Sequence, residues 1–114
     1  MRGLWGSVFD RYRLINLEVY VKTIKHGRDT VVAVCDAELL GKTLQGGRVS
    51  FKVNERFYGG VQASVEEAIE AIRKSTISNL VGKKIVEAAI AHKMVNESSV
   101  IYFGDVPHTQ IVIL

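Results

Sequence analysis

The sequence predicts a single small α+β domain, in which a mostly antiparallel or mixed sheet packs against two helices. Three observations lead to this prediction. The chain has 114 residues, a length that suits one compact domain. Apolar residues alternate along several short segments, as in strands, whereas two longer segments show the spacing of amphipathic helices. These segments follow one another in the order β-β-β-α-α-β-β, which is typical of α+β domains.

The domain is predicted to span residues 18–114, and residues 1–17 to form a leader or arm outside it. The leader holds three arginines and one aspartate, so it carries most of the chain's formal net charge of +3. A stripe of apolar residues runs along it at helical spacing: Trp5, Val8, Phe9 and Tyr12. Two interpretations stay open. The leader is either an arm that docks on a partner or an RNA surface, or a segment that folds back on its own domain or reflects an upstream start codon.

Two strands joined by a hairpin turn are predicted at the start of the domain. Residues 17–24 alternate between apolar and polar, as in a strand with one buried face. Residues 30–36 are apolar on both faces, which indicates a central strand covered on both sides. Gly27 lies between them and suits the turn.

A short helical turn and a third strand are expected next. The turn should cover residues 37–40, and the strand residues 49–53. Because the strand alternates, its apolar side chains Val49, Phe51 and Val53 are expected to face inward.

The first long helix is predicted to begin at Ser64. Ser64 and Glu67 have the spacing of a capping box, in which each side chain satisfies a free backbone N–H group of the other. Gly82 then interrupts the helical pattern, and a second helix is predicted over residues 83–92. The apolar face of the first helix consists of Val65, Ala68, Ile69 and Ile72.

Two more strands complete the prediction, over residues 100–103 and 109–114, with a turn at 104–108 between them. No run of residues without charge approaches the roughly 18 that a membrane span needs, so no membrane contact is expected. The single cysteine fits a reducing compartment, and a cytoplasmic location is expected.

Two patterns suggest a nucleotide-binding loop and a nucleophilic cysteine, and the residues around each argue against these roles. Residues 41–43 read Gly-Lys-Thr, but a phosphate-binding loop needs a glycine five positions earlier, where this chain has Asp36. Cys35 lies in the most apolar segment, where a small buried thiol is the expected role.

The histidines show no metal-ligand spacing, so neither a metal nor another cofactor is expected; they are His26, His92 and His108.

Two polar segments remain as candidate sites. In residues 107–110 a rigid turn brings His108 and Gln110 to the start of a strand, where the imidazole suits proton transfer, phosphate contact or base stacking. The alternative is a histidine that bonds backbone in a tight turn. In residues 78–84 a glycine opens a helix and two lysines follow, which offers free N–H groups and positive charge to an anion. The alternative there is a helix that ends at the glycine, followed by a solvated basic turn.

Residues 57–60 add two aromatic rings beside flexible backbone. Exposed, they would suit a stacking platform for bases or a protein contact. Buried loop aromatics are the alternative.

Six segments in this order resemble the archaeal domain-of-unknown-function family 424. They are 19–22 (VYVK), 33–36 (AVCD), 38–42 (ELLGK), 57–60 (FYGG), 79–82 (NLVG) and 106–110 (VPHTQ). The resemblance covers residues 19–114 and leaves out residues 1–17. It implies no established activity, cofactor or catalytic residue. Because genes of such proteins tend to lie near translation genes, it implies a role around RNA or the ribosome.

The first hypothesis is therefore a binding protein for RNA, the ribosome or translation factors. Its candidate contacts are Lys42, Arg48, Tyr58, Asn79, Lys83, Lys84, His108 and Gln110. One alternative is a protein-interaction module or homodimeric subunit that makes no RNA contact. Another is a small enzyme centred on His108, with Asp105 or Asn79 beside it. Binding ranks above catalysis because no nucleophile–base pair stands out, and no catalytic residue is assigned.

Overall fold

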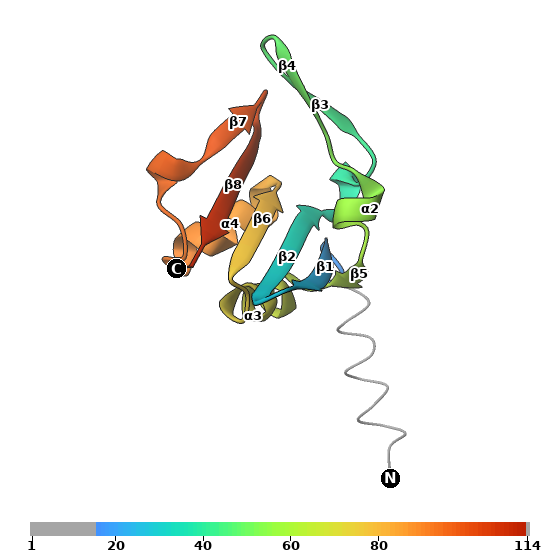
Figure 1. The fold of residues 1–114 in the computed structure, drawn as a ribbon. Coiled ribbons are helices and arrows are strands. Elements are labelled where there is room, and N and C mark those ends of the chain that lie inside the picture. The colour runs from blue at the N-terminus through green and yellow to red at the C-terminus, as the bar shows by residue number, and fades with distance from the viewer. Residues whose placement is uncertain (1–15, 114) are drawn as a thin grey trace.

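The computed structural model describes residues 16–113, so the predicted leader, apart from its last two residues, lies outside the described residues (Figure 1). The strands are β1 (Val19–His26), β2 (Asp29–Asp36), β3 (Thr43–Gly46), β4 (Val49–Lys52), β5 (Val61–Ala63), β6 (Ile77–Val81), β7 (Ile101–Phe103) and β8 (Val106–Val112). The helices are α2 (Glu55–Tyr58), α3 (Val65–Arg73) and α4 (Lys83–Ala91), with 3-10 turns η1 (Ala37–Leu39) and η2 (Glu97–Ser99).

Six strands form one sheet in the order β5-β1-β2-β6-β8-β7, and β3 pairs with β4 in a separate hairpin. Only β2 and β6 pair in parallel within the larger sheet, and its other neighbours are antiparallel. The predicted α+β class, with a mixed, mostly antiparallel sheet in a small single domain, is confirmed.

The β1–β2 hairpin follows the prediction closely. His26 lies opposite Asp29, and Gly27 takes a φ of +62° in the turn between them. β2 lies between β1 and β6, and its residues 32–36 are buried. The strand that is apolar on both faces is therefore the central, doubly covered strand that its sequence predicts.

Helices α3 and α4 cover one face of the sheet. The predicted capping box starts α3: the Ser64 hydroxyl accepts the Glu67 N–H at 3.1 Å, and the Glu67 carboxylate accepts the Ser64 N–H at 3.0 Å. The helices bury their apolar sides against alternate residues of the sheet. The buried members of this first core are Val19, Val32, Val34, Ala63, Ala68, Ile69, Ile72, Leu80, Ile85, Val86 and Ala89.

A second, smaller core lies on the opposite face. Ala33 and Cys35 alternate with the residues of the first core along β2, so they point to this other face. The β3–β4 hairpin and α2 cover them there. The buried members are Ala33, Cys35, Leu44, Val53, Tyr58 and Val81, with Phe51 and Phe103 packed against them.

Several elements differ from the prediction. The predicted order lacks the strands β3, β5 and β6; β6 lies between the two long helices in sequence and between β2 and β8 in the sheet. The strand β8 begins at Val106, earlier than predicted, so His108 lies within a strand instead of a turn. Val49 is exposed instead of facing inward, because the hairpin leaves the core toward its tip.

Part of the second face has no cover from the described residues. Ile24 lies opposite Val31, Val31 beside Ile77, and Ile77 opposite Val112, so four aliphatic side chains cross four adjacent strands in one line. We call these four residues the apolar row. Ile24 is 41% exposed and Val112 54% exposed, whereas the middle two are half-buried.

Candidate functional site

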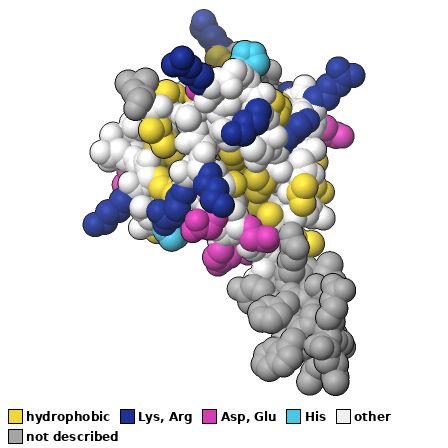
Figure 2. Space-filling model, turned by 60° about the horizontal axis from the view of Figure 1, so that its bottom comes forward, with side chains coloured by type: hydrophobic (Ala, Val, Ile, Leu, Met, Phe, Trp, Pro, Cys, Tyr) yellow, Lys and Arg dark blue, Asp and Glu magenta, His cyan; other side chains and the backbone are white. Residues whose placement is uncertain are grey.

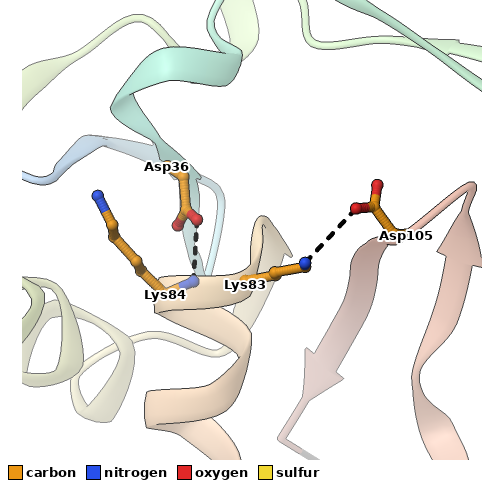
Figure 3. A network of polar contacts seen from close by, with 4 residues as sticks. All are labelled: Asp36, Lys83, Lys84 and Asp105. Atoms are coloured by element: carbon orange, nitrogen blue, oxygen red, sulfur yellow. Dashed lines mark hydrogen bonds and ion pairs between the residues drawn. The ribbon is translucent and has the colours of Figure 1, made fainter.

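The end of the sheet where β2 and β6 stop is built around a buried carboxylate. Asp36 is the last residue of β2, and α4 begins just after β6, the strand parallel to it. One oxygen of Asp36 accepts the N–H of Lys84 at 2.9 Å (Figure 3). The other oxygen accepts the N–H of Ile85 at 3.1 Å. The carboxylate thus caps the positive end of the helix dipole.

This arrangement corrects one sequence-based interpretation. One of the two interpretations of residues 78–84 was that a glycine before Lys83 and Lys84 opens a helix whose free N–H groups bind an external anion. The helix does begin after Gly82, but two of its first N–H groups already bind Asp36. The chain supplies its own anion at this helix start.

Gly82 makes room for that carboxylate. Its φ is +121° and its ψ 150°, a backbone conformation that is essentially confined to glycine. A Cβ at this position would lie 2.3 Å from Cγ of Asp36 and 2.6 Å from both of its oxygens. No side chain fits between the strand end and the helix start.

Burial also sets the chemistry of the two groups at the end of β2. It raises the pKa of Asp36 above its ordinary value, although the N–H groups of Lys84 and Ile85 act in the opposite direction. Burial likewise raises the pKa of the Cys35 thiol to about 12, and the neighbouring Asp36 carboxylate adds to this. Cys35 is fully buried, so the prediction that it is a core residue is confirmed.

The side chains of Lys83 and Lys84 are exposed beside this cap, and each faces an acidic partner. Nζ of Lys83 lies 3.5 Å from a carboxylate oxygen of Asp105 (Figure 3). Nζ of Lys84 lies 4.0 Å from a carboxylate oxygen of Glu38. Exposed pairs of this kind contribute little to stability. They do balance the positive charge at this end of the sheet.

A local excess of positive charge lies on the β3–β4 hairpin. We call residues 42–54 the basic hairpin, because they include Lys42, Arg48 and Lys52 and no acidic residue. All three side chains are exposed, with Arg48 in the turn at the tip. The tip of the hairpin extends beyond the rest of the domain (Figure 1). On the face drawn in Figure 2, by contrast, basic side chains are spread among other groups instead of gathering in one patch.

Aromatic packing holds the base of the basic hairpin in place. The Phe51 ring stacks on Phe103 of β7 with centroids 5.1 Å apart and planes at 28°. Gly46 approaches the same residue so closely that a Cβ there would lie 2.9 Å from a ring carbon of Phe103. The hairpin is therefore a positioned element that packs against both β7 and the second core.

His108 belongs to this aromatic group. Its ring centroid lies 5.1 Å from that of Phe51 and 6.1 Å from that of Phe103. Burial lowers the pKa of the imidazole, which favours its neutral form. Within residues 16–113 no side chain or backbone group forms a hydrogen bond with this ring, so it has gained no catalytic partner there.

Tyr58, a candidate binding residue, is buried, so of the two interpretations left open for it the buried aromatic holds and the exposed stacking ring does not. Residues 55–58 form the short helix α2 instead of a loop, and the ring points into the second core. It makes edge contacts with Phe51, at 6.4 Å between centroids, and Phe57, at 4.9 Å. Burial raises the pKa of its hydroxyl to about 12. A base cannot stack on a ring enclosed in this way.

Comparison with known proteins places this architecture in a family. Residues 23–114 match the model of a family described as protein of unknown function (DUF424). The chain belongs to the DUF424 family. It is also similar to the crystal structure of an uncharacterized conserved protein from Methanopyrus kandleri, with a TM-score of 0.73 and 26% sequence identity over 84% of this chain and 91% of that chain. A search of curated proteins finds no match.

Asn79 and Gln110 complete the set of predicted site residues in this DUF424 domain. They lie opposite each other in β6 and β8, and Gln110 shares its face of β8 with His108 two residues earlier. Asp105, the partner suggested for His108, instead pairs with Lys83. Within residues 16–113 no three His, Cys, Asp or Glu side chains come together as a metal site. The helices of this part of the chain are all too short or too polar to cross a membrane.

Two residues of the candidate site were not singled out from the sequence. The capping role of Asp36 joins residues 48 and 49 positions apart, so no local pattern reveals it. Lys52 belongs to the basic hairpin, and its signal was present: the thirteen residues from 42 to 54 hold no acidic side chain.

Proposed function

We propose that this DUF424 protein binds RNA in the cytoplasm, on the ribosome or with translation factors, and that the basic hairpin makes the contact. One observation carries the proposal. Three exposed cationic side chains, with no acidic residue between them, occupy a hairpin whose tip extends beyond the rest of the domain (Figure 1). Phosphate backbones attract such elements because cationic side chains release the counterions condensed on nucleic acid.

The other predicted cationic contacts support this proposal less. Lys83 and Lys84 each lie near a carboxylate, and an RNA phosphate would have to compete with it. Lys42, Arg48 and Lys52 have no ion pair with any described residue. Compared with Lys83 and Lys84, the hairpin therefore offers a phosphate the more favourable electrostatic interaction. The two lysines of α4 lie outside the hairpin and are secondary contacts.

We expect the triple variant Lys42→Ser, Arg48→Ser, Lys52→Ser to bind structured RNA at least about tenfold more weakly. Each lost phosphate contact also removes about 0.7 to 0.9 from the slope of log affinity against log salt concentration. Fluorescence anisotropy with labelled transfer RNA, between about 50 and 200 mM salt, measures both quantities.

A charge-matched control separates the hairpin from a general effect of net charge. Lys25→Ser, Lys74→Ser, Lys93→Ser removes the same charge from exposed positions elsewhere. Its affinity and salt slope should stay close to those of the parent protein. Equal weakening in the two triple variants would remove the basis of the proposal, as would a parent protein that binds no RNA.

The apolar row favours a second candidate, a homodimer formed through the open part of the sheet face. Aliphatic side chains in a line across adjacent strands of a sheet can pack against the same line in a second copy, as in a two-fold interface. Multi-angle light scattering should then give a dimer for the parent protein and a monomer for Ile24→Lys, Val112→Lys. Val49→Lys, which changes an exposed valine on the hairpin, is the control and should stay dimeric. A monomeric parent protein at high concentration excludes this candidate.

A further inference from the structure

The two faces of the basic hairpin differ in chemistry. Leu44 and Phe51 lie opposite each other and pack into the second core. Because side chains alternate along a strand, their neighbours project from the other side. That outer face carries only polar and cationic exposed groups. They are Thr43, Gln45, Ser50 and Lys52, with Arg48 at the tip.

Aromatic rings are not available on this hairpin for stacking with bases. Phe51, its one aromatic residue, is itself stacked on Phe103, and the predicted platform at Tyr58 is buried. Tyr102 is 62% exposed, but it alternates with Phe103 along β7 and so projects from the opposite face of that strand. Single-stranded RNA is recognised mainly through bases stacked on exposed rings, which the hairpin lacks.

The polar groups of the outer face suit a different form of RNA. Hydroxyl and amide groups can donate to and accept from ribose 2′-hydroxyls, and the cationic groups can bind phosphates. An A-form helix displays both on its wide, shallow minor groove, which a protein reads mainly by shape and backbone contact. A two-stranded ribbon with such a face is complementary to that surface.

We infer that the basic hairpin binds helical RNA, through its phosphates and minor-groove 2′-hydroxyls, in preference to single strands. This inference rests on the proposed function, since it names the form of RNA that the same hairpin takes. It requires no base-specific contact, so affinity should depend little on the sequence of the duplex.

Three labelled probes test the inference by fluorescence anisotropy with the whole chain. They are an RNA duplex of about 20 base pairs, a uridine homopolymer of equal length, and a DNA duplex of the same sequence as the RNA duplex. We expect the RNA duplex to bind about tenfold more tightly than either of the other two. Equal or tighter binding of the homopolymer or of the DNA duplex overturns the inference and leaves the proposed function standing. Absence of binding to all three probes overturns both.

Two variants connect that preference to the outer face. The double variant Gln45→Ala, Ser50→Ala should bind the RNA duplex more weakly, with an affinity close to that for the DNA duplex. The slope of log affinity against log salt concentration should not change, because no charge is removed. Tyr102→Ala should leave the affinity for every probe unchanged. A loss of RNA binding in Tyr102→Ala would indicate stacking on that ring and overturn the inference. Urea unfolding of both variants confirms that the fold is intact.

Discussion

Gly82→Ala is expected to lower the free energy of unfolding by about 3–5 kcal/mol, because two costs add at one position. An alanine there is forced into a backbone conformation essentially confined to glycine, at a φ of +121°. Its Cβ would also lie 2.3 Å from Cγ of Asp36, so the carboxylate must leave the helix start. The N–H groups of Lys84 and Ile85 would then lose their acceptor. Urea unfolding followed by circular dichroism measures the change.

Gly27→Ala is the matched control. Gly27 also has a positive φ, +62°, but a Cβ there meets no atom within 4 Å. It should therefore lose only the backbone contribution, about 1–2 kcal/mol. If the two alanine variants are equally stable, the close approach of Asp36 to Gly82 does not contribute to the stability of the domain.

Asp36→Ala is expected to lower the free energy of unfolding by about 2–3 kcal/mol, since it removes the acceptor of two backbone N–H groups at the start of α4. This loss should depend on pH. Burial raises the pKa of Asp36 in the folded protein above its ordinary value of 3.8. The stabilisation that this shift provides is complete below 3.8 and is lost as the pH rises through the folded-state pKa.

The difference in stability between the parent protein and Asp36→Ala should therefore be largest near pH 4 and smaller at pH 7. Denaturant unfolding of both proteins across this range gives the difference directly. Asp36→Asn keeps one acceptor and should lie between them at low pH. Asp105→Asn, at an exposed carboxyl, is the control for the general effect of removing an acid. A penalty for Asp36→Ala that grows with pH would contradict the assignment of burial as the dominant influence on this group.

Local signals in the sequence predicted much of the fold correctly. The capping box at Ser64, the turn at Gly27 and the apolar run of β2 each depend on residues close together in the chain, and each lies where expected. The α+β class follows from those elements. Such features are set by backbone hydrogen bonding and side-chain periodicity within one element.

Features that depend on distant residues were not predicted. β6 is only five residues long and includes Ser78 and Asn79, a weak strand pattern by itself. It forms a strand because β2 and β8 supply its partners, and because the buried Ser78 hydroxyl lies 2.5 Å from that of Ser75. The environment of Tyr58 was undecided for a similar reason. Whether an aromatic residue is exposed depends on what packs over it, here the hairpin that carries Phe51.

The candidate site shows the same division. The cationic residues of the basic hairpin are visible in the sequence, but their separation from acidic groups in space is a tertiary property. The helix start after Gly82 has the sequence features of an anion site, and only the long-range contact from Asp36 shows that it is filled. Patterns in sequence thus identified the chemical groups, while the fold decided which of them are available.

The position of Cys35 under the basic hairpin gives the domain a built-in reporter. It is the chain's one cysteine, and it shares the second core with Leu44 of β3. A reagent in solution can reach this thiol only when the second core opens, at the hairpin or at α2, or when the whole domain unfolds. The rate at which a thiol-specific dye reacts therefore measures how often this core opens, without any added label. A ligand that binds the hairpin and holds it against the domain would lower the rate of this reaction.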